Sequence, residues 1–164
     1  MNGVIKKSLQ LLMSTSVPQY LDSGLPYSPR QQGSGIADCW NALETEAYLY
    51  NAKEEYSKAK ISLFDDPERT GNFQATFHIK NISKDQQTYQ MKPIALSQNV
   101  VKDDLGTLVF DGTEREVTSQ VQIRLLRDGK LIKGNQVTVA AGEDVAIDVE
   151  FQMDKELMKF QFGR

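Results

Sequence analysis

Two side chains in this sequence could act as a general base or as a nucleophile, and each residue type occurs once: His78 and Cys39. His78 alternates with apolar neighbours, which places it on the polar face of an expected strand. It has no evident carboxylate partner and no serine or cysteine in a strained turn, whereas general-base chemistry requires such groups within hydrogen-bond reach. We therefore interpret His78 as a solvated or cross-strand surface histidine rather than as a catalytic base.

Cys39 precedes Trp40 in a segment with helical spacing. We interpret its thiol as a half-buried structural side chain rather than as a nucleophile. A single cysteine forms no disulfide within the chain, and one cysteine with one histidine cannot make a zinc site. Because cytosolic proteins and Gram-positive secreted proteins both manage without disulfides, the cysteine count does not identify the compartment.

Two acidic pairs, Asp65-Asp66 and Asp103-Asp104, could attract a cation. Neither has the alternating oxygen ligands and closing glutamate of a calcium loop, and a weak calcium site stays open as an alternative. The Gly33-Ser34-Gly35 stretch lacks the lysine and preceding apolar strand of a phosphate-binding loop, so we interpret it as a tight turn before a helix. The sequence therefore predicts no catalytic, metal-binding or cofactor-binding residue, and no cofactor.

Helical periodicity occurs near the N-terminus. Ile5, Leu9 and Leu12 recur at i, i+4 and i+7, which predicts a helix over residues 4–13. The apolar stretch is too short and too interrupted for a signal peptide, and Pro18 ends the helix. Because a helix of about ten residues is marginal in water, this one needs a surface to pack on.

A loop and a second, shorter helix are expected next. Residues 18–35 are rich in proline and glycine and predict an extended loop. Residues 36–43 predict the short helix, with Asp38 near its start. The apolar face of this helix consists of Ile36, Trp40 and Leu43.

Beyond residue 46 the apolar period changes from helical to alternating. Asp128-Gly129 predicts a hairpin turn, and residues 98–117 predict a long loop or an extra hairpin. About seven short strands with one polar face indicate a mainly β fold. We expect an immunoglobulin- or fibronectin-like antiparallel β-sandwich at 45–164, preceded by a short helical segment at 1–44. The alternating stretches are 59–63, 73–79, 89–91, 121–125, 137–139 and 145–151.

Composition excludes several classes of protein. Hydrophobic residues make up 40% of the 164, enough for a core, so the chain is not disordered throughout. The net charge is −3 with the two signs interspersed, so we expect no nucleic-acid partner. No window approaches the run of about 18 apolar residues that a membrane span requires, so we expect no membrane insertion.

Two stretches resemble the large cell-envelope subtilases, the lactocepins and complement-cleaving peptidases. Residues 11–16 (Leu-Leu-Met-Ser-Thr-Ser) resemble the end of a late helix in subtilisin-like proteases, with Ser16 in place of the usual alanine. Residues 27–36 (Tyr-Ser-Pro-Arg-Gln-Gln-Gly-Ser-Gly-Ile) resemble a family segment that leads into the closing helix of the catalytic domain, here residues 37–43.

The rest of the chain resembles the fibronectin-like sandwich that follows in that family. The matching stretches are the tyrosine-rich strand at 47–50, the Phe-x-Ala-x-Phe-x-Ile strand at 73–81 and the turn at 136–145. The family's nucleophile lies in a Gly-Thr-Ser-Met-Ala turn upstream of the first helix, and its aspartate and histidine lie further upstream. None of these motifs occurs here, so no catalytic role transfers to any residue.

The resemblance implies a non-catalytic C-terminal part of a secreted or cell-wall-associated serine endopeptidase. We expect Met1 to be an introduced or misassigned start, the missing catalytic domain to be a partner in cis, and peptides or proteins to be the parent's substrates. We also expect the Ile5/Leu9/Leu12 stripe to dock on its own sandwich or on a second copy, giving a homodimer. The alternatives are a stand-alone β-sandwich adhesion module of a bacterial surface protein, and a protease inhibitor or pro-segment.

Overall fold

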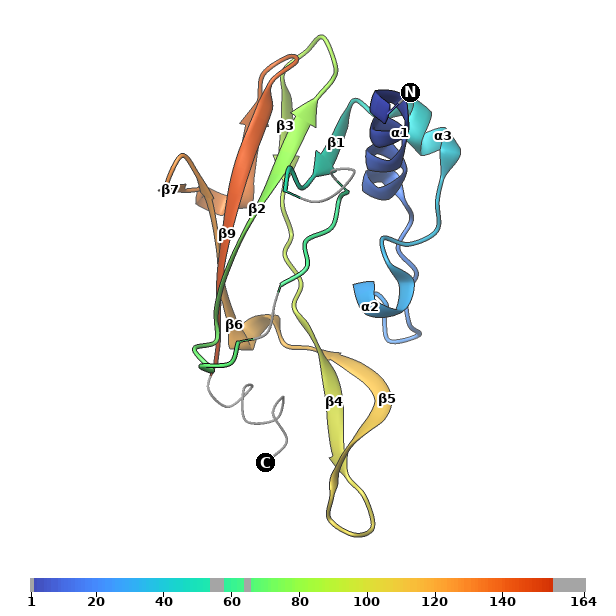
Figure 1. Ribbon diagram of the computed structural model, residues 1–164, viewed down its shortest axis with the longest axis vertical. Coiled ribbons are helices and arrows are strands. Elements are labelled where there is room, and N and C mark those ends of the chain that lie inside the picture. Colours follow the sequence, from blue (N-terminus) through green and yellow to red (C-terminus); the bar gives the residue numbers. More distant parts are fainter. Residues whose placement is uncertain (1, 54–57, 64–65, 155–164) are drawn as a thin grey trace.

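The chain folds as a mainly β protein with a helical segment at its N-terminal end (Figure 1). The computed structural model describes residues 2–53, 58–63 and 66–154, and the side chains of the first helix from Lys7 onward. More of the described residues lie in strands than in helices, and the sheets are antiparallel. The predicted mainly β, antiparallel character is therefore confirmed.

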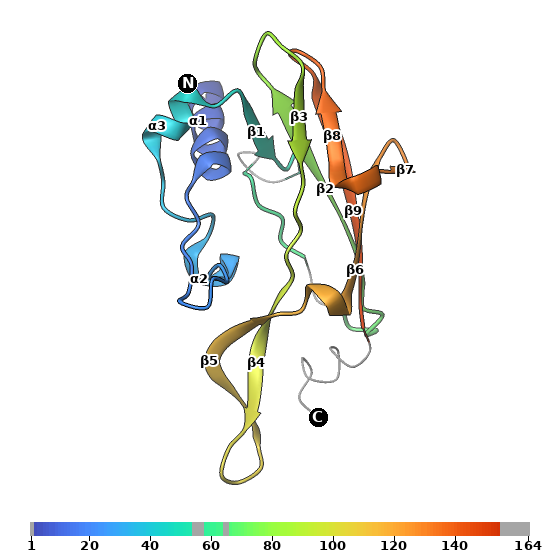
Figure 2. The same cartoon turned by 180° about the vertical axis from the view of Figure 1, so that it is seen from behind.

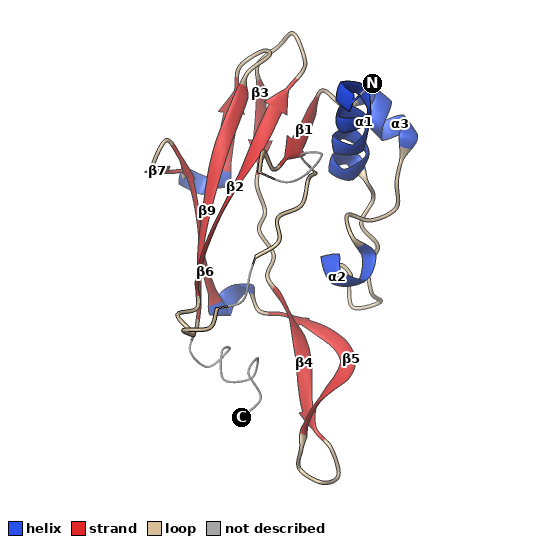
Figure 3. Cartoon of the chain, in the orientation of Figure 1, coloured by secondary structure: helices blue, strands red, loops and turns tan. Residues whose placement is uncertain are grey.

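Helix α1 (Asn2–Thr15) includes the predicted first helix. Leu9 and Leu12 are half-buried, because α1 packs against helix α3 (Cys39–Glu44) and the first strand; the side chain of Ile5 lies outside the described residues. Figure 3 shows α1 and α3 together on one side of the strands. The apolar stripe of α1 thus finds its packing surface, at least in part, within its own chain.

Two features of the helical segment differ from the prediction: the start of the second predicted helix, and an additional short helix. Helix α3 begins at Cys39 rather than at residue 36, because the Asp38 carboxylate accepts a hydrogen bond from the Asn41 backbone N–H at 2.9 Å and caps the first turn. Ile36 instead forms an isolated β-bridge. The predicted loop also contains a short helix, α2 (Pro29–Gln32), which starts at a proline whose fixed φ suits a first helical turn.

The main sheet has five strands in the order β1-β2-β9-β6-β7, with every pair antiparallel. Their register places Ile79 opposite Val145 and Phe77 opposite Ile147, so that apolar side chains of neighbouring strands share one face. The strands are β1 (Ala47–Tyr50), β2 (Asn72–Asn81), β6 (Val121–Arg127), β7 (Lys130–Leu131) and β9 (Asp144–Met153).

The core lies between this sheet and a second, two-stranded layer formed by β3 (Gln87–Gln90) and β8 (Gln136–Val139). From the back, in Figure 2, β3 and β8 lie over part of the larger sheet only. Two short 3₁₀ helices, Thr118–Gln120 and Lys133–Asn135, flank β6 and β8. The buried core residues are Ile79, Leu125, Val137, Val139, Val145 and Ile147.

Both hairpin expectations are confirmed. Asp128 and Gly129 have φ of 52° and 72° and join β6 to β7, as expected for a tight Asp-Gly turn. The irregular 98–117 region contains a hairpin, β4 (Leu96–Lys102) with β5 (Leu108–Glu116). This arm projects away from the two sheet layers in Figures 1 and 2.

The strand expected over residues 59–63 is absent. Residues 58–63 form no ladder within the described part of the chain. Their backbone is tied instead to Asn51, whose backbone N–H donates to Lys58 O at 2.9 Å and whose side chain donates to Lys60 O at 3.3 Å. Three alternating apolar residues are a weak strand signal when another partner satisfies the backbone.

In the part of the chain that the structure describes, no helix has the length and apolar character needed to cross a bilayer.

Candidate docking surface

The helical segment, residues 2–44, is closed on itself by a short backbone bridge. Val17 and Ile36 exchange two backbone hydrogen bonds of 2.9 and 3.0 Å. The Ser16 hydroxyl donates to the carbonyl of Ser34, which adds a third link between the same two stretches. These bonds return the chain to the end of α1 and so place α3 beside it.

Gly35 makes this bridge sterically feasible. Its φ is +112°, and a Cβ atom there would lie 2.5 Å from the Val17 carbonyl oxygen, which is backbone and cannot rotate away. Only glycine combines that backbone angle with that close approach at low cost. The expected tight turn at residues 33–35 is therefore a point where two stretches of main chain touch.

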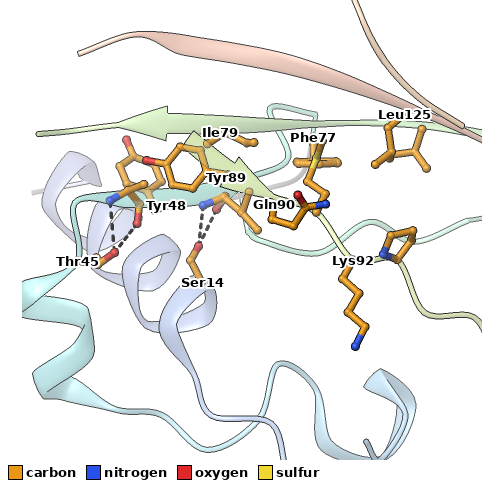
Figure 4. A pocket seen from close by; sticks show the side chains of 14 residues that line it. Ser14, Thr45, Tyr48, Phe77, Ile79, Tyr89, Gln90, Lys92 and Leu125 are labelled. Atoms are coloured by element: carbon orange, nitrogen blue, oxygen red, sulfur yellow. Dashed lines mark hydrogen bonds between the residues drawn. The ribbon is translucent and has the colours of Figure 1, made fainter. Parts of the chain in front are cut away.

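Two side chains attach the helical segment to the strands. The Ser14 hydroxyl accepts from the Leu49 N–H at 2.8 Å and donates to the Leu49 carbonyl at 3.1 Å (Figure 4). On the arm, the Glu114 carboxylate accepts from the Ser28 N–H at 3.1 Å. Because the first contact is on β1 and the second on β5, the helical segment is held at two separate points.

The helical segment carries several large apolar side chains that are exposed. Trp40 is 71% exposed and Leu43 is 79% exposed, and they lie one turn apart on α3. Ile36 and Tyr20 are 59% and 60% exposed. We call these four residues the apolar surface. Burying a large apolar side chain is worth roughly 1.5–3 kcal/mol, so leaving Trp40 and Leu43 in water is costly unless another body covers them.

The single histidine does have a carboxylate partner, contrary to the sequence interpretation. His78 Nδ1 lies 3.0 Å from Asp144 Oδ1, while the Tyr50 hydroxyl donates to Asp144 Oδ2 at 2.6 Å. The rings of Tyr50 and His78 are stacked with centroids 4.8 Å apart. Sequence reasoning missed Asp144 because it is 66 residues away and is brought near only by the β2–β9 register.

This cluster joins three strands rather than positioning a nucleophile. Tyr50 comes from β1, His78 from β2 and Asp144 from β9. Burial, followed by the hydrogen bond to Asp144, raises the pKa of the Tyr50 hydroxyl above its usual value, so the phenol stays protonated and keeps donating. Burial, with Asp144 as the second cause, also raises the pKa of Tyr48. His78 is thus a cross-strand histidine, as expected, but one with ordered partners.

The other candidates are placed as follows. Cys39 is exposed, so the expected half-buried thiol is wrong; the residue occupies the first helical position of α3, on the solvent side. Asp66 accepts from the Gly71 N–H at 2.7 Å, and Asp103 accepts from the backbone of Leu105 and Thr107, so each carboxylate closes its own turn. Asp65 lies outside the described residues.

The sequence matches no protein-family model and no curated protein.

Among the described residues, no group of three or more histidine, cysteine or acidic side chains gathers in a way that could hold a metal ion. The feature that the structure adds is therefore the apolar surface together with its two attachments. Its members Trp40 and Leu43 belong to the helical face expected from the sequence, whereas Ile36 lies before α3, in the bridge to Val17. The attachment residues Ser14 and Glu114 were not foreseen, since hydrogen bonds across 35 and 86 positions leave no local signal.

Proposed function

We propose that this chain is a non-catalytic accessory part of a secreted subtilisin-like serine endopeptidase. The helical segment packs on the catalytic body, and the strands form a fibronectin type III-like β-sandwich that braces that body or spaces it from the cell surface. The observation that carries the proposal is the exposure of Trp40 and Leu43 on helix α3, which packs on helix α1; Ser14 of α1 is in turn hydrogen-bonded to β1.

The apolar surface has the character of an interface centre. Tryptophan and tyrosine are the side chains that contribute most to binding when they are desolvated, and Trp40 and Tyr20 both belong to this surface. The resemblance of residues 11–16 and 27–36 to the subtilase segment favours a catalytic domain in cis as the body that covers it. Residue 36, at the end of the second stretch, is itself part of the apolar surface.

The two attachments suit a bracing role. If the helical segment packed on the catalytic body but were only loosely connected to the strands, the catalytic body would not fix the orientation of the β-sandwich. Here the bonds of Ser14 to Leu49 and of Glu114 to Ser28 connect it to two different strands. The orientation of the β-sandwich would then follow that of the catalytic body.

The test uses the whole chain with a lactocepin-type catalytic domain that lacks its own last helical segment. Titration calorimetry should detect binding of the wild-type chain and a loss of about tenfold or more for Trp40→Ser and for Leu43→Ser, since each removes one buried anchor. Leu105→Ser is the matched control, because Leu105 is 90% exposed at the tip of the arm. Absence of binding by the wild-type chain, or equal losses in all three variants, would contradict the proposal.

A role in substrate engagement is tested on the parent enzyme. If the β-sandwich contacts extended substrates, deleting it lowers kcat/KM for long substrates more than for short peptides. Identical ratios for the two substrate lengths would discard that role and leave bracing alone.

A second candidate function is a stand-alone adhesion module, and the β4–β5 arm favours it. The arm carries exposed apolar side chains at Val101, Leu105, Leu108, Val109 and Phe110. In that case the Leu105→Ser change, not Trp40→Ser, would reduce binding to the surface partner.

Homodimer formation is the remaining proposal for the helical segment. Leu9 and Leu12 are half-buried against their own chain, so a dimer would use Trp40 and Leu43 as well. Sedimentation equilibrium of the wild type and of Trp40→Ser distinguishes this arrangement: a dimer lost in the variant supports it, and a monomer at all concentrations excludes it.

A further inference from the structure

An apolar groove of about 530 Å³ lies between the strands β1 and β3, which border it on two sides (Figure 4). Phe77, Leu125 and Val149 of the larger sheet line its floor, and Tyr89 and Met91 line its wall. Sites for small ligands and peptide side chains commonly have volumes of about 300–1,000 Å³. The groove is therefore large enough to hold several side chains of a binding partner.

The edge of β1 beside the groove has no free backbone groups. The Ser14 hydroxyl bonds to both the N–H and the C=O of Leu49. In the same way the Thr45 hydroxyl accepts from the Ala47 N–H at 3.3 Å and donates to the Ala47 carbonyl at 2.7 Å (Figure 4). Since Ala47 and Leu49 are the β1 residues whose backbone groups point away from β2, two hydroxyl groups close this edge to a further strand.

The edge of β3 on the other side of the groove is open. Within the described residues β3 pairs with β8 alone. The Met91 N–H donates to Asn135 O at 2.8 Å, on the β8 side. Because successive residues of an antiparallel strand direct their backbone groups to opposite sides, the N–H and C=O of Thr88 and Gln90 point away from β8, and no described residue bonds to them. These two donors and two acceptors have the spacing that another extended backbone matches.

The two faces of β3 decide which side chains such a backbone would carry. Tyr89 is half-buried and packs against the core, whereas Thr88 and Gln90 are exposed. Directly opposed strand residues direct their side chains to the same face. A residue opposite Tyr89 therefore meets the apolar floor, and residues opposite Thr88 and Gln90 meet solvent. The partner strand is thus apolar at every second position and polar between.

Lys92 adds a preference for charge. It is exposed, and it is the one charged side chain among the described residues that line the groove. None of the ion pairs formed by the described residues includes it. Lys92 follows Gln90 by two positions, so the residue opposite it lies on the solvent face of the added strand. An acidic side chain at that position would form a cross-strand ion pair.

We propose that this groove binds an extended peptide segment of another protein, added as an antiparallel strand to the free edge of β3. Its apolar side chains contact Phe77, Leu125 and Val149, and an acidic side chain lies beside Lys92. In this mode of recognition the main-chain hydrogen bonds give affinity and the alternating side chains give specificity. The inference stands whether or not the chain belongs to a protease, since it uses no residue of the apolar surface.

The first test is titration calorimetry of the full-length chain with the synthetic peptide acetyl-Glu-Val-Thr-Val-Thr-Val-Thr-amide. With its glutamate opposite Lys92, its first two threonines lie opposite Gln90 and Thr88. N-methylation of these two threonines should weaken binding by about tenfold or more, because it removes both donors that face β3. The matched control is N-methylation of the first two valines, whose N–H groups point away from β3, and it should leave binding nearly unchanged.

The second test exchanges charges. Lys92→Glu should weaken binding of the same peptide by about threefold or more, because a like-charge pair replaces an ion pair across the strands. A peptide that begins with lysine should bind this variant better than it binds the wild type. The control is Lys130→Glu, at an exposed position on β7 at the opposite edge of the main sheet, which should bind both peptides as the wild type does.

The third test is amide exchange measured by NMR. Saturating peptide should slow exchange at Thr88 and Gln90 by about tenfold or more, because both amides gain a partner. Gln87 and Tyr89 are the internal controls. Their N–H groups already face β8, so their exchange should slow far less.

Four results would overturn the proposal. The first is no binding of the unmethylated peptide. The second is an equal loss from both methylation patterns, which would mean that the groove takes apolar groups without pairing a strand. The third is equal slowing of exchange at all four β3 amides. The fourth is a dimer in sedimentation equilibrium that the peptide dissociates, which would assign the free edge to a second copy of this chain.

Discussion

The hydroxyl of Ser14 occupies the place of a neighbouring strand beside Leu49. It accepts from the Leu49 N–H at 2.8 Å and donates to the Leu49 carbonyl at 3.1 Å. Among the described strands, β1 is the edge of the main sheet and pairs only with β2. Exposed strand edges recruit other chains, so one serine at the end of α1 both attaches the helical segment and closes the edge.

Ser14→Ala should weaken this attachment. The two backbone groups of Leu49 are near solvent, so water replaces part of the lost bonding and the free energy of unfolding falls by only about 0.5–1.5 kcal/mol. Amide exchange at Leu49 should quicken. Urea unfolding and exchange measured by NMR check both effects, and Lys7→Ala, exposed on the same helix, is the control. Unchanged exchange at Leu49 would mean that the serine does not hold the edge.

Gly35→Ala should be among the most damaging single changes in the helical segment. The added methyl group would meet the Val17 carbonyl and also hold φ at +112°, so we expect a loss of about 2 kcal/mol or more in urea unfolding. Gly24→Ala separates the two causes. Gly24 also has positive φ, +81°, but has open space around it, so its variant should lose less. Equal losses would show that the contact with Val17 does not matter.

Tyr50→Phe should change stability at alkaline pH. Because the folded state raises the pKa of the hydroxyl, its contribution is present below the ordinary value of about 10 and is lost as pH rises beyond it. The urea midpoint of the wild type should therefore fall more steeply above about pH 10 than that of the variant. At neutral pH the variant should be about 1 kcal/mol less stable through the lost bond to Asp144. The control is Tyr20→Phe, at an exposed position, which should retain the wild-type alkaline profile.

Asp66→Asn should change how the stability of the protein depends on pH under acidic conditions. The hydrogen bonds from the Gly71 N–H, first, and from Thr70 lower the pKa of this carboxyl. A lowered pKa contributes stability above the unfolded value, and that contribution disappears as pH falls through the folded value. The difference in urea midpoint between wild type and variant should thus be present near neutral pH and shrink as the pH falls below the ordinary pKa of an aspartate, about 3.9. Asp104→Asn is the control, and a difference that stays constant with pH would refute this role.

Local patterns were sufficient for several elements. Alternation predicted β2, β6 and β9, because a strand with one apolar face repeats every two residues whatever it pairs with. The Asp128-Gly129 turn was predicted because positive φ is a property of the residues themselves. Residues 59–63 failed as a strand because alternation says nothing about whether a free edge is available.

The candidate site was predictable only in part. The helical spacing of Trp40 and Leu43 predicted the apolar face of α3. The first residue of α3 was not predicted, because it depends on the hydrogen bond between the Asp38 side chain and the Asn41 backbone. Whether Cys39 would be exposed depended on which side of α3 meets α1, and composition carries no such information.

The sequence by itself determined the mainly β character, the hairpin turns and the two helices that flank the proline-rich loop, because these follow from the periodicity and backbone preferences of neighbouring residues. Only the tertiary structure decided that Asp144 reaches His78, that Ser14 closes the edge at Leu49 and that Glu114 binds Ser28. Strand register and chain crossing set those distances, and both depend on which distant apolar faces are buried together.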